Sequence, residues 1–258
     1  TFADGASSST ISVSTADEDG SYVLGTQAVT VNNVAPTGSL TGAGDTNEGA
    51  TYLLSISASD AAGIADPLSY SIDWGDGSAA QVLTAAALAA LGGQVGHVFA
   101  DDQDGPVNAT PRNVVVTVTD GDGGSTDLAK TVTVHNVAPS ATVSGAATTD
   151  EGSVYTLTVG AVSDPGADTR TGYTIDWGDG SVASFTPAQW AAAAGSFTHT
   201  FADGASSSTI SVSTADEDGS YVLGTQAVTV NNVAPTGSLT GAGDTNEGAT
   251  YLLSISAS

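Results

Sequence analysis

The chain contains the same 59-residue segment twice. Residues 1–59, which begin TFADGASSST, return without a change at residues 200–258, so the sequence has a period of 199 residues. Self-similarity at a fixed period is typical of arrays in which each structural unit contacts only its neighbours along the chain. We therefore expect a row of small domains, taken from a longer parent protein, in place of one large core.

A second, diverged repeat lies inside this period and is marked by the tetrapeptide NVAP, which occurs three times. These marks divide the chain into two kinds of module that alternate, with full lengths of 103 and 96 residues. The predicted parts are the end of a truncated second-type module at 1–34, a full first-type module at 35–137, a full second-type module at 138–233 and the start of a truncated first-type module at 234–258.

Each module has the pattern of a β protein. Short runs rich in Thr, Val and Ser are separated by Gly, Asp and Asn, and the segment YSIDW at 70–74 alternates large apolar and small polar residues. Alternation with a period of two indicates strands with one buried face. About seven short antiparallel strands in about 100 residues favour a two-sheet sandwich of immunoglobulin-like type.

One short helix is expected in each module. The segment LTAAALAALGG at 83–93 has Thr84 as an N-cap, and its counterpart FTPAQWAAAAG at 185–195 has Thr186 followed by proline at the first helical position. These are helix-start signals, and each segment ends at a glycine. A helix of two or three turns is too short to cross a membrane, so we expect it to cover the core.

The charge is strongly one-sided. Asp and Glu number 28 and Lys and Arg only three, which gives a formal net charge of −25. Such a surface repels nucleic acid and anionic lipid, because phosphate contacts need basic side chains. It attracts hard divalent cations, which prefer carboxylate oxygens. Cysteine is absent, so disulfides and thiolate metal sites are excluded, and no apolar run is long enough for membrane insertion.

Three elements in the same order make both full modules resemble the PKD (polycystic kidney disease) domain family. They are the corner IDWGDGS, a His two residues before a Phe in GHVFAD and THTFAD, and the following strand and loop in VVVTVTDGDG and ISVSTADEDG. The tryptophan is shifted two places from the family's usual corner, which together with the helix marks a variant of the kind found in very long bacterial repeat proteins. The resemblance implies an extracellular sandwich that spaces or binds and does not catalyse.

The corner itself has three interpretations: an acid/base pair, a metal loop, or a backbone turn. Asp73 and Asp76 lie three residues apart at a strand end, and they would flank a turn more readily than a substrate cleft. The neighbouring glycines supply the backbone freedom that such a turn needs. We expect a structural corner, structural roles for the equivalent His97 and His199, and no enzymatic activity.

Sandwich topology predicts which acidic loops share an end. In each module, the loop after the first strand lies at one end, together with the loop after the tripeptide Phe-Ala-Asp (99–101 and 201–203). The loops after the second and sixth strands lie at the other end. We therefore expect oxygen ligands for Ca²⁺ at the junctions between modules, as in cadherins, although Asp and Asn are also common in solvated turns. The predicted ligands are Glu48, Asp101, Asn136, Asp216 and Asp218 at the junction near 137/138, then Glu151, Asp203 and Asn232 below the second module, and Asp120 and Asp122 facing Asn33 above the first.

Two functions fit these features. The first is a structural, extracellular array at the cell surface: the stalk or fibre of a large secreted bacterial surface protein or adhesin, with neighbouring modules as partners and Ca²⁺ at the junctions. Such chains could also self-assemble into filaments. The alternative is an accessory binding module of a secreted polysaccharide- or protein-degrading enzyme, which would need exposed aromatic rings. Tyr22 and its copy Tyr221 are the best candidates for these.

Overall fold

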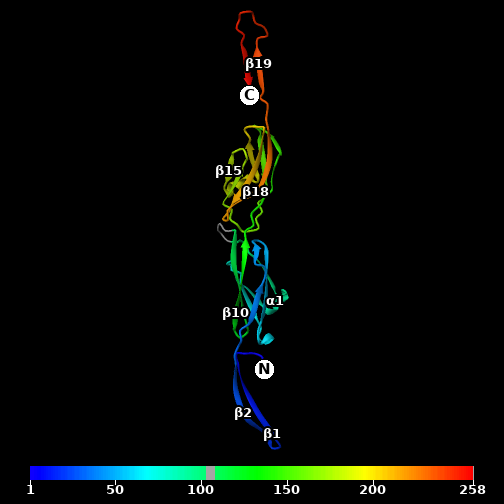
Figure 1. Ribbon diagram of the computed structural model, residues 1–258, viewed down its shortest axis with the longest axis vertical. Helices are drawn as coiled ribbons and strands as arrows, with labels where there is room; N and C mark the ends of the chain where they lie inside the picture. The colour runs from blue at the N-terminus through cyan, green and yellow to red at the C-terminus, as the bar shows by residue number, and fades with distance from the viewer. Residues whose placement is uncertain (103–107, 258) are drawn as a thin grey trace. The chain divides into compact units, whose positions relative to one another are not determined.

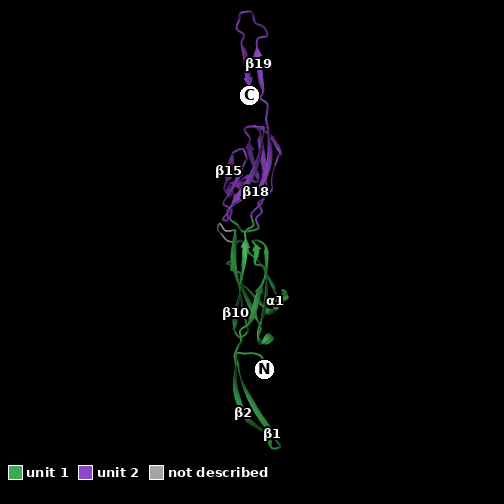
Figure 2. Cartoon of the chain, in the orientation of Figure 1, with its two compact units in different colours: residues 1–137, 165–168 green, residues 138–164, 169–258 purple. Residues whose placement is uncertain are grey.

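The computed structural model of the chain describes residues 1–102 and 108–257 (Figure 1). It separates into two compact units, one of residues 1–137 and 165–168 and the other of residues 138–164 and 169–258 (Figure 2). Each unit holds one β-sandwich and one two-stranded hairpin. Within the described residues, no helix has both the length and the apolar character needed to cross a bilayer.

The sandwich of the first unit has eight strands in two sheets. One sheet has the order β3-β5-β8 and the other the order β4-β10-β9-β6-β7. A 3-10 turn, Gly63–Ala65, precedes β6, and helix α1 (Ala85–Ala90) follows β7. The strands are β3 Thr37–Thr41, β4 Asp45–Asn47, β5 Thr51–Ser59, β6 Ser69–Asp73, β7 Gln81–Thr84, β8 Gln94–Val98, β9 Ala109–Thr119 and β10 Ser125–His135.

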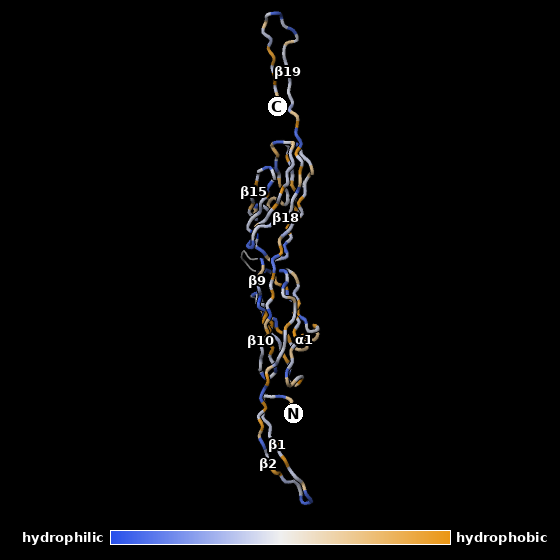
Figure 3. Tube along the Cα trace, viewed as in Figure 1, coloured by the Kyte–Doolittle hydropathy of each residue, from blue (hydrophilic) through white to orange (hydrophobic). Residues whose placement is uncertain are grey.

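Apolar residues that alternate along these strands fill the space between the two sheets. Figure 3 shows this alternation of apolar and polar positions along the chain. Trp74, Leu54 and Phe99 are almost fully buried, and Leu88 of α1 closes the core as expected for a covering helix. The fold class predicted from the sequence, a tandem set of immunoglobulin-like sandwiches, is confirmed.

The expectation of purely antiparallel pairing is wrong at one strand in each sandwich. After β3 the chain crosses to the other sheet, where β4 pairs in parallel with β10, Thr133 facing Asp45. This short strand covers the outer edge of β10, whose backbone groups would otherwise stay unpaired. The second sandwich repeats the feature with β12 (Thr148–Asp150) and β18 (Ser220–Asn231).

The second unit has the same architecture. Its sheets have the orders β11-β13-β16 and β12-β18-β17-β14-β15, and α2 (Pro187–Ala193) follows β15. Trp177, Phe201 and Ile210 are at the centre of its core. The remaining strands are β11 Val143–Gly145, β13 Val154–Val159, β14 Gly172–Asp176, β15 Val182–Phe185, β16 Ser196–Thr200 and β17 Ser206–Ala215.

Both helices begin where the capping residues predict. The Thr84 hydroxyl accepts a hydrogen bond from the Ala87 amide, and Thr186 and Gln189 form a reciprocal capping box. These bonds satisfy amides that have no partner inside the helix. Trp190 of α2 stacks on Tyr173 with ring centroids 4.3 Å apart, so the second helix also packs onto the core.

The repeated segment forms the same hairpins in both copies. In the first unit β1 (Ser7–Asp17) pairs with β2 (Gly20–Val31), in the register and with the bulge that β17 and β18 have in the second unit. Likewise β19 (Gly237–Gly241) pairs with β20 (Leu253–Ala257) as β3 pairs with β5. The compact units do not separate these terminal hairpins from the sandwiches, so the four-part module division stays a prediction.

Candidate cation-binding sites and the aspartate corner

The corner IDWGDGS is a turn held by its own aspartates. The Asp73 carboxylate accepts a hydrogen bond of 2.9 Å from the Gly75 amide, and Asp76 accepts bonds of 3.0 and 2.6 Å from the amide and hydroxyl of Ser78. Gly75 has φ of 73°, a left-handed conformation that favours glycine. Both carboxyl groups therefore stabilise the local backbone.

A histidine from β8, in the other sheet of the sandwich, completes the corner. His97 Nε2 lies 2.6 Å from Asp76 Oδ2, and its ring stacks on Trp74 with centroids 4.4 Å apart and planes 5° apart. Burial alone would raise the pKa of Asp76, but hydrogen bonds from Ser78 and His97 outweigh burial and lower its pKa. The second unit repeats this contact, with His199 Nε2 2.7 Å from Asp179. The pairing of histidine with the corner was not predicted from the sequence, although the two occur together in both modules.

Glu48 lies where the first sandwich meets its outgoing linker. Its side chain is 1% exposed, and its two oxygens accept hydrogen bonds from the amides of Val137, at 2.6 Å, and Asp102, at 3.2 Å. Its own amide donates to the carbonyl oxygen of His135 at 3.0 Å. The glutamate thus ties the loop after β4 to the linker and to the loop after Phe99.

Acidic groups and one basic group surround Glu48. Glu48, Asp101 and Asp102 each place a carboxylate oxygen within 4.8 Å of the others. Burial has the largest effect on the pKa of Glu48 and raises it, whereas the hydrogen bonds from the Val137 and Asp102 amides lower it. The charges of Asp102 and Asp101 raise this pKa further, and the net change is upward. Arg112 Nη2 donates to the carbonyl oxygens of Asp101 and Asp102, so a cationic side chain already lies at this cluster. Asn136 lies beside it in the linker, half-buried, its amide bonded to the Asn108 carbonyl at 3.1 Å.

The equivalent residues of the second unit are more open. Glu151 is half-buried and accepts hydrogen bonds from the amides of Gly204 and Val233, which repeats the role of Glu48. Asp203 and Asn232 are exposed. Across the described part of the second unit alone, no three carboxylate or imidazole groups converge on one point.

The loop between β9 and β10 holds the other predicted ligands of the first unit. Asp120 Oδ1 accepts hydrogen bonds from the amides of Asp122 and Gly124, at 3.1 and 2.7 Å, and its Oδ2 accepts one of 2.9 Å from Asn33. The structure thus brings Asp120 to Asn33, as the topology implies. Asp122 is exposed on the same turn.

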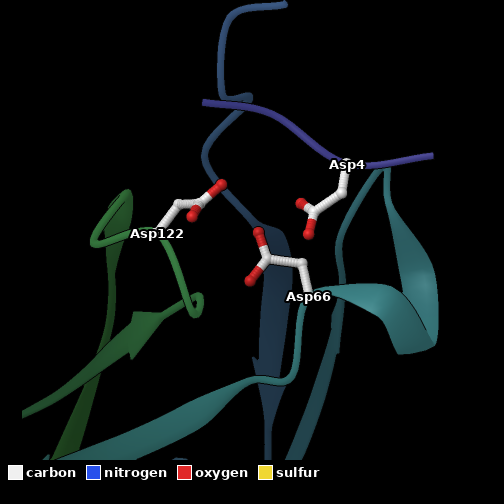
Figure 4. A group of neighbouring side chains, drawn as sticks. All are labelled: Asp4, Asp66 and Asp122. Carbon is white, nitrogen blue, oxygen red and sulfur yellow. The ribbon is translucent and has the colours of Figure 1, made fainter. Parts of the chain in front are cut away.

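Three further aspartates, Asp4, Asp60 and Asp66, lie at this end, and sequence reasoning missed them. Asp4, Asp66 and Asp122 each place a carboxylate oxygen within 4.8 Å of the others, and Figure 4 shows the three groups pointing toward one another. Asp60 and Asp66 form a second such group with Asp120. Asp66 stands between a 3-10 turn and a proline, in a loop whose sequence has no motif that would have revealed its partners.

Asp216 and Asp218 of the second unit are both buried, in a turn like that of Asp120. Asp216 Oδ1 accepts hydrogen bonds of 3.1 Å from the amides of Asp218 and Gly219. Glu48 and Asp101 belong to the first unit, and Asp216 and Asp218 to the second. Their convergence on one calcium ion stays a prediction.

Among the described residues, the exposed aromatic side chains lie in the terminal hairpins or in the segment that precedes β1. They are Phe2, Tyr22 and Tyr251. The copies of Phe2 and Tyr251 in the complete sandwiches, Phe201 and Tyr52, are buried in the two cores. Tyr221, the copy of Tyr22, is half-buried. These rings therefore do not form a platform on either sandwich.

Three features identify the fold: the order of strands in the paired sheets, the strand that crosses between them, and a separate core in each unit. The modules are immunoglobulin-like sandwiches. No protein-family model matches the chain, and neither does any curated protein.

Several solved structures resemble the chain. A tetra-tandem repeat in the extending region of a large adhesion protein is 20% identical with a TM-score of 0.40, covering 97% of this chain and 63% of that one. The FN1–FN3 domains of chicken CNTN1 are 13% identical with a TM-score of 0.26, covering 87% and 76%. A red sea bream transglutaminase is 11% identical with a TM-score of 0.30, covering 77% and 31%.

Proposed function

We propose that the chain is a structural segment of an extracellular tandem-repeat array. In this proposal its modules are PKD-like sandwiches that form the stalk or fibre of a large secreted bacterial surface protein or adhesin. The array presents or spaces other domains and carries no enzymatic activity of its own. Calcium ions stiffen it at the ends of the modules.

One observation carries the proposal: the chain is built of two closed cores in sequence order, flanked by hairpins whose sequences also occur inside complete sandwiches. Ile11, Val13 and Leu24 are exposed on the terminal hairpin, although the same residues are buried in the second unit as Ile210, Val212 and Leu223. A hairpin that leaves such a face open is the expected part of a further module in a repeating series.

The chemistry of the corners also favours a structural role. Asp73 and Asp76 are engaged in holding a turn, and the same contacts recur at Asp176 and Asp179. A repeated corner with a repeated bonding pattern fits a part that every module needs in order to fold. The alternative role as an accessory binding module would need a platform of exposed aromatic rings, and the described residues of the two sandwiches form no such platform.

The array can be tested by its length. The longest strands of the two sandwiches are β9 with 11 residues and β18 with 12, which span about 36 and about 40 Å at roughly 3.3 Å per residue. Each added 199-residue period should therefore add about 75 Å to the maximum dimension. Small-angle X-ray scattering of chains with one, two and three periods measures this dimension. A dimension that grows only as the cube root of mass would show a merged globule and refute the array.

The calcium part is tested separately on the chain itself. A ligand of the folded state stabilises it by about 2.7 kcal/mol at a concentration 100 times its Kd. The thermal midpoint should therefore rise clearly when millimolar Ca²⁺ replaces EGTA. A midpoint that does not move would remove calcium from the proposal and leave the array intact.

A further inference from the structure

We infer that the first unit carries a calcium-binding site formed by Asp4, Asp66 and Asp122, with Asp60 and Asp120 beside it. This inference deepens the calcium part of the proposed function and rests on it. Of these residues, only Asp120 and Asp122 were expected as ligands from the sequence. Asp66 is the centre of the site, because it belongs to both groups of converging carboxylates.

The geometry brings together three parts of the chain that are far apart in sequence. Asp4 precedes strand β1, Asp66 follows the 3-10 turn, and Asp122 lies in the loop between β9 and β10 (Figure 4). One oxygen from each lies within 4.8 Å of the others. Oxygens that each lie about 2.3–2.6 Å from a common Ca²⁺ are separated by at most twice that distance, and oxygens within 4.8 Å of one another meet this limit.

Asp66 supplies an observation that an acidic cluster alone would not. Its side chain is only 2% exposed, and its Oδ1 accepts a hydrogen bond from the Gly121 amide. Its Oδ2 is inaccessible to solvent and has no hydrogen-bond partner within the described structure. Asp60 repeats the pattern, since Oδ1 accepts from the Ala62 amide at 2.7 Å and the buried Oδ2 has no partner. Burying a polar atom without a partner costs free energy, so a ligand that binds these two oxygens would stabilise the folded state.

Electrostatics point to a cation. Burial raises the pKa of Asp66 against the Gly121 hydrogen bond, and the charges of Asp120, Asp122 and Asp4 raise it further. Within the described residues, none of the five aspartates forms an ion pair with Lys, Arg or His. The Glu48 cluster differs, because both glutamate oxygens accept backbone amides and Arg112 lies beside it.

The class of cation follows from the ligands. All of them are carboxylate oxygens, which suit hard cations and not the nitrogen- or sulfur-preferring transition metals. Ca²⁺ accepts six to eight oxygens in irregular arrangements, whereas Mg²⁺ demands a regular octahedron at about 2.1 Å. The carboxylates of Asp4, Asp66 and Asp122 come from three separate segments outside the strands, and such an irregular arrangement fits the larger ion better. A bound ion would also fasten the segment around Asp4 to the sandwich that follows it.

The test is isothermal titration of the 258-residue chain with CaCl₂ after removal of metal by EGTA. We expect Asp66→Asn to lower the number of bound Ca²⁺ ions by one, or to weaken one binding step at least tenfold. Asp127→Asn is the matched control: the same charge is removed from the same unit, at an exposed residue whose side chain accepts a hydrogen bond from the Thr117 hydroxyl. It should leave every binding step unchanged.

A second readout separates binding from folding. In EGTA, Asp66→Asn should melt no lower than the original chain, because it removes a buried charge and keeps the oxygen that faces the Gly121 amide. If that variant does not fold, Asp122→Asn, at an exposed residue, should show the same loss of one ion.

The outcomes distinguish this inference from the broader proposal. If the chain binds Ca²⁺ and Asp66→Asn and Asp122→Asn bind it equally well, the site is refuted while calcium elsewhere in the array stands. Equal affinity for Mg²⁺ at the step that Asp66→Asn removes would overturn the assignment to calcium. No binding by the original chain would overturn both this site and the calcium part of the proposed function, and it would leave the array itself intact.

Discussion

Ile11 and Ile210 occupy the same place in two identical segments, and we predict very different costs for truncating them. Ile11 is 48% exposed on the terminal hairpin, whereas Ile210 is 0% exposed in the second core. Changing Ile210 to Ala removes three buried carbon atoms, worth about 2.4 kcal/mol at roughly 0.8 kcal/mol each. The cavity adds to this, so we expect a loss of about 3 kcal/mol, within the usual range of about 2–5 kcal/mol.

Hydrogen exchange measured by mass spectrometry can read each unit separately. Peptides from residues 172–185 report on the second unit and peptides from 69–84 on the first, and neither stretch lies in the repeated segment. For exchange through global opening, a loss of about 3 kcal/mol should speed exchange in 172–185 more than 100-fold, since about 1.4 kcal/mol is tenfold. Ile11→Ala should change exchange in both peptides by less than a factor of about 3, as for a surface change below roughly 0.5 kcal/mol. Equal effects of the two substitutions would refute the reasoning, because only burial distinguishes them.

Three further predictions concern the corner, the helix cap and pH. In urea unfolding, Gly75→Ala should destabilise the first unit by more than Gly77→Ala. Both glycines have positive φ, a conformation that costs about 1–2 kcal/mol for a residue with a side chain. Only at Gly75 would the new carbon also lie 2.6 Å from a backbone oxygen of β9. Equal losses would contradict this. Thr186→Ala should cost the second unit about 1 kcal/mol in the same assay through loss of the capping bond, and no loss would show that the cap is idle. In EGTA, the thermal midpoint of the first unit should rise as the pH falls from neutral toward the ordinary carboxyl pKa of about 4. Burial raises the pKa values of Glu48 and Asp66, because a buried negative charge costs free energy in the folded state. This cost is present above the folded pKa and vanishes below it, so the folded unit gains stability as the two groups take up protons. The gain in stability ends near about pH 4, where the carboxyl groups of the unfolded chain also take up protons. Asp66→Asn should show a smaller rise, and an equal rise would remove Asp66 from the explanation.

The features that could be predicted from the sequence depend on residues near one another in the chain. Thr84 and Thr186 mark the helix starts because an N-cap bonds to amides within the next three residues. The corner was predicted because Asp73 and Asp76 bond to amides two residues ahead. The ladder between β1 and β2 is likewise local, since a short turn sets its register.

The acidic sites depend on residues that are distant in the chain. Asp120 and Asn33 were placed together because sandwich topology puts their loops at the same end. Asp66 could not be found this way, because its contact with Gly121 depends on how a loop with no regular structure folds over the end of the sheet. The bond between His97 and Asp76 was missed for the same reason: it joins β8 to the turn after β6, a strand of the other sheet.

The two copies of the repeated segment separate the two kinds of information. Sequence by itself determined the hairpins, because identical residues form β1–β2 and β17–β18 in the same register with the same bulge. Only the tertiary structure decided what those hairpins bury. The tripeptide Asp45–Asn47 forms a strand because β10 lies beside it, whereas its copy at 244–246 has no such neighbour and forms none. Backbone hydrogen bonds within a hairpin are made by the segment itself, whereas burial and edge pairing need a second surface that the segment does not contain.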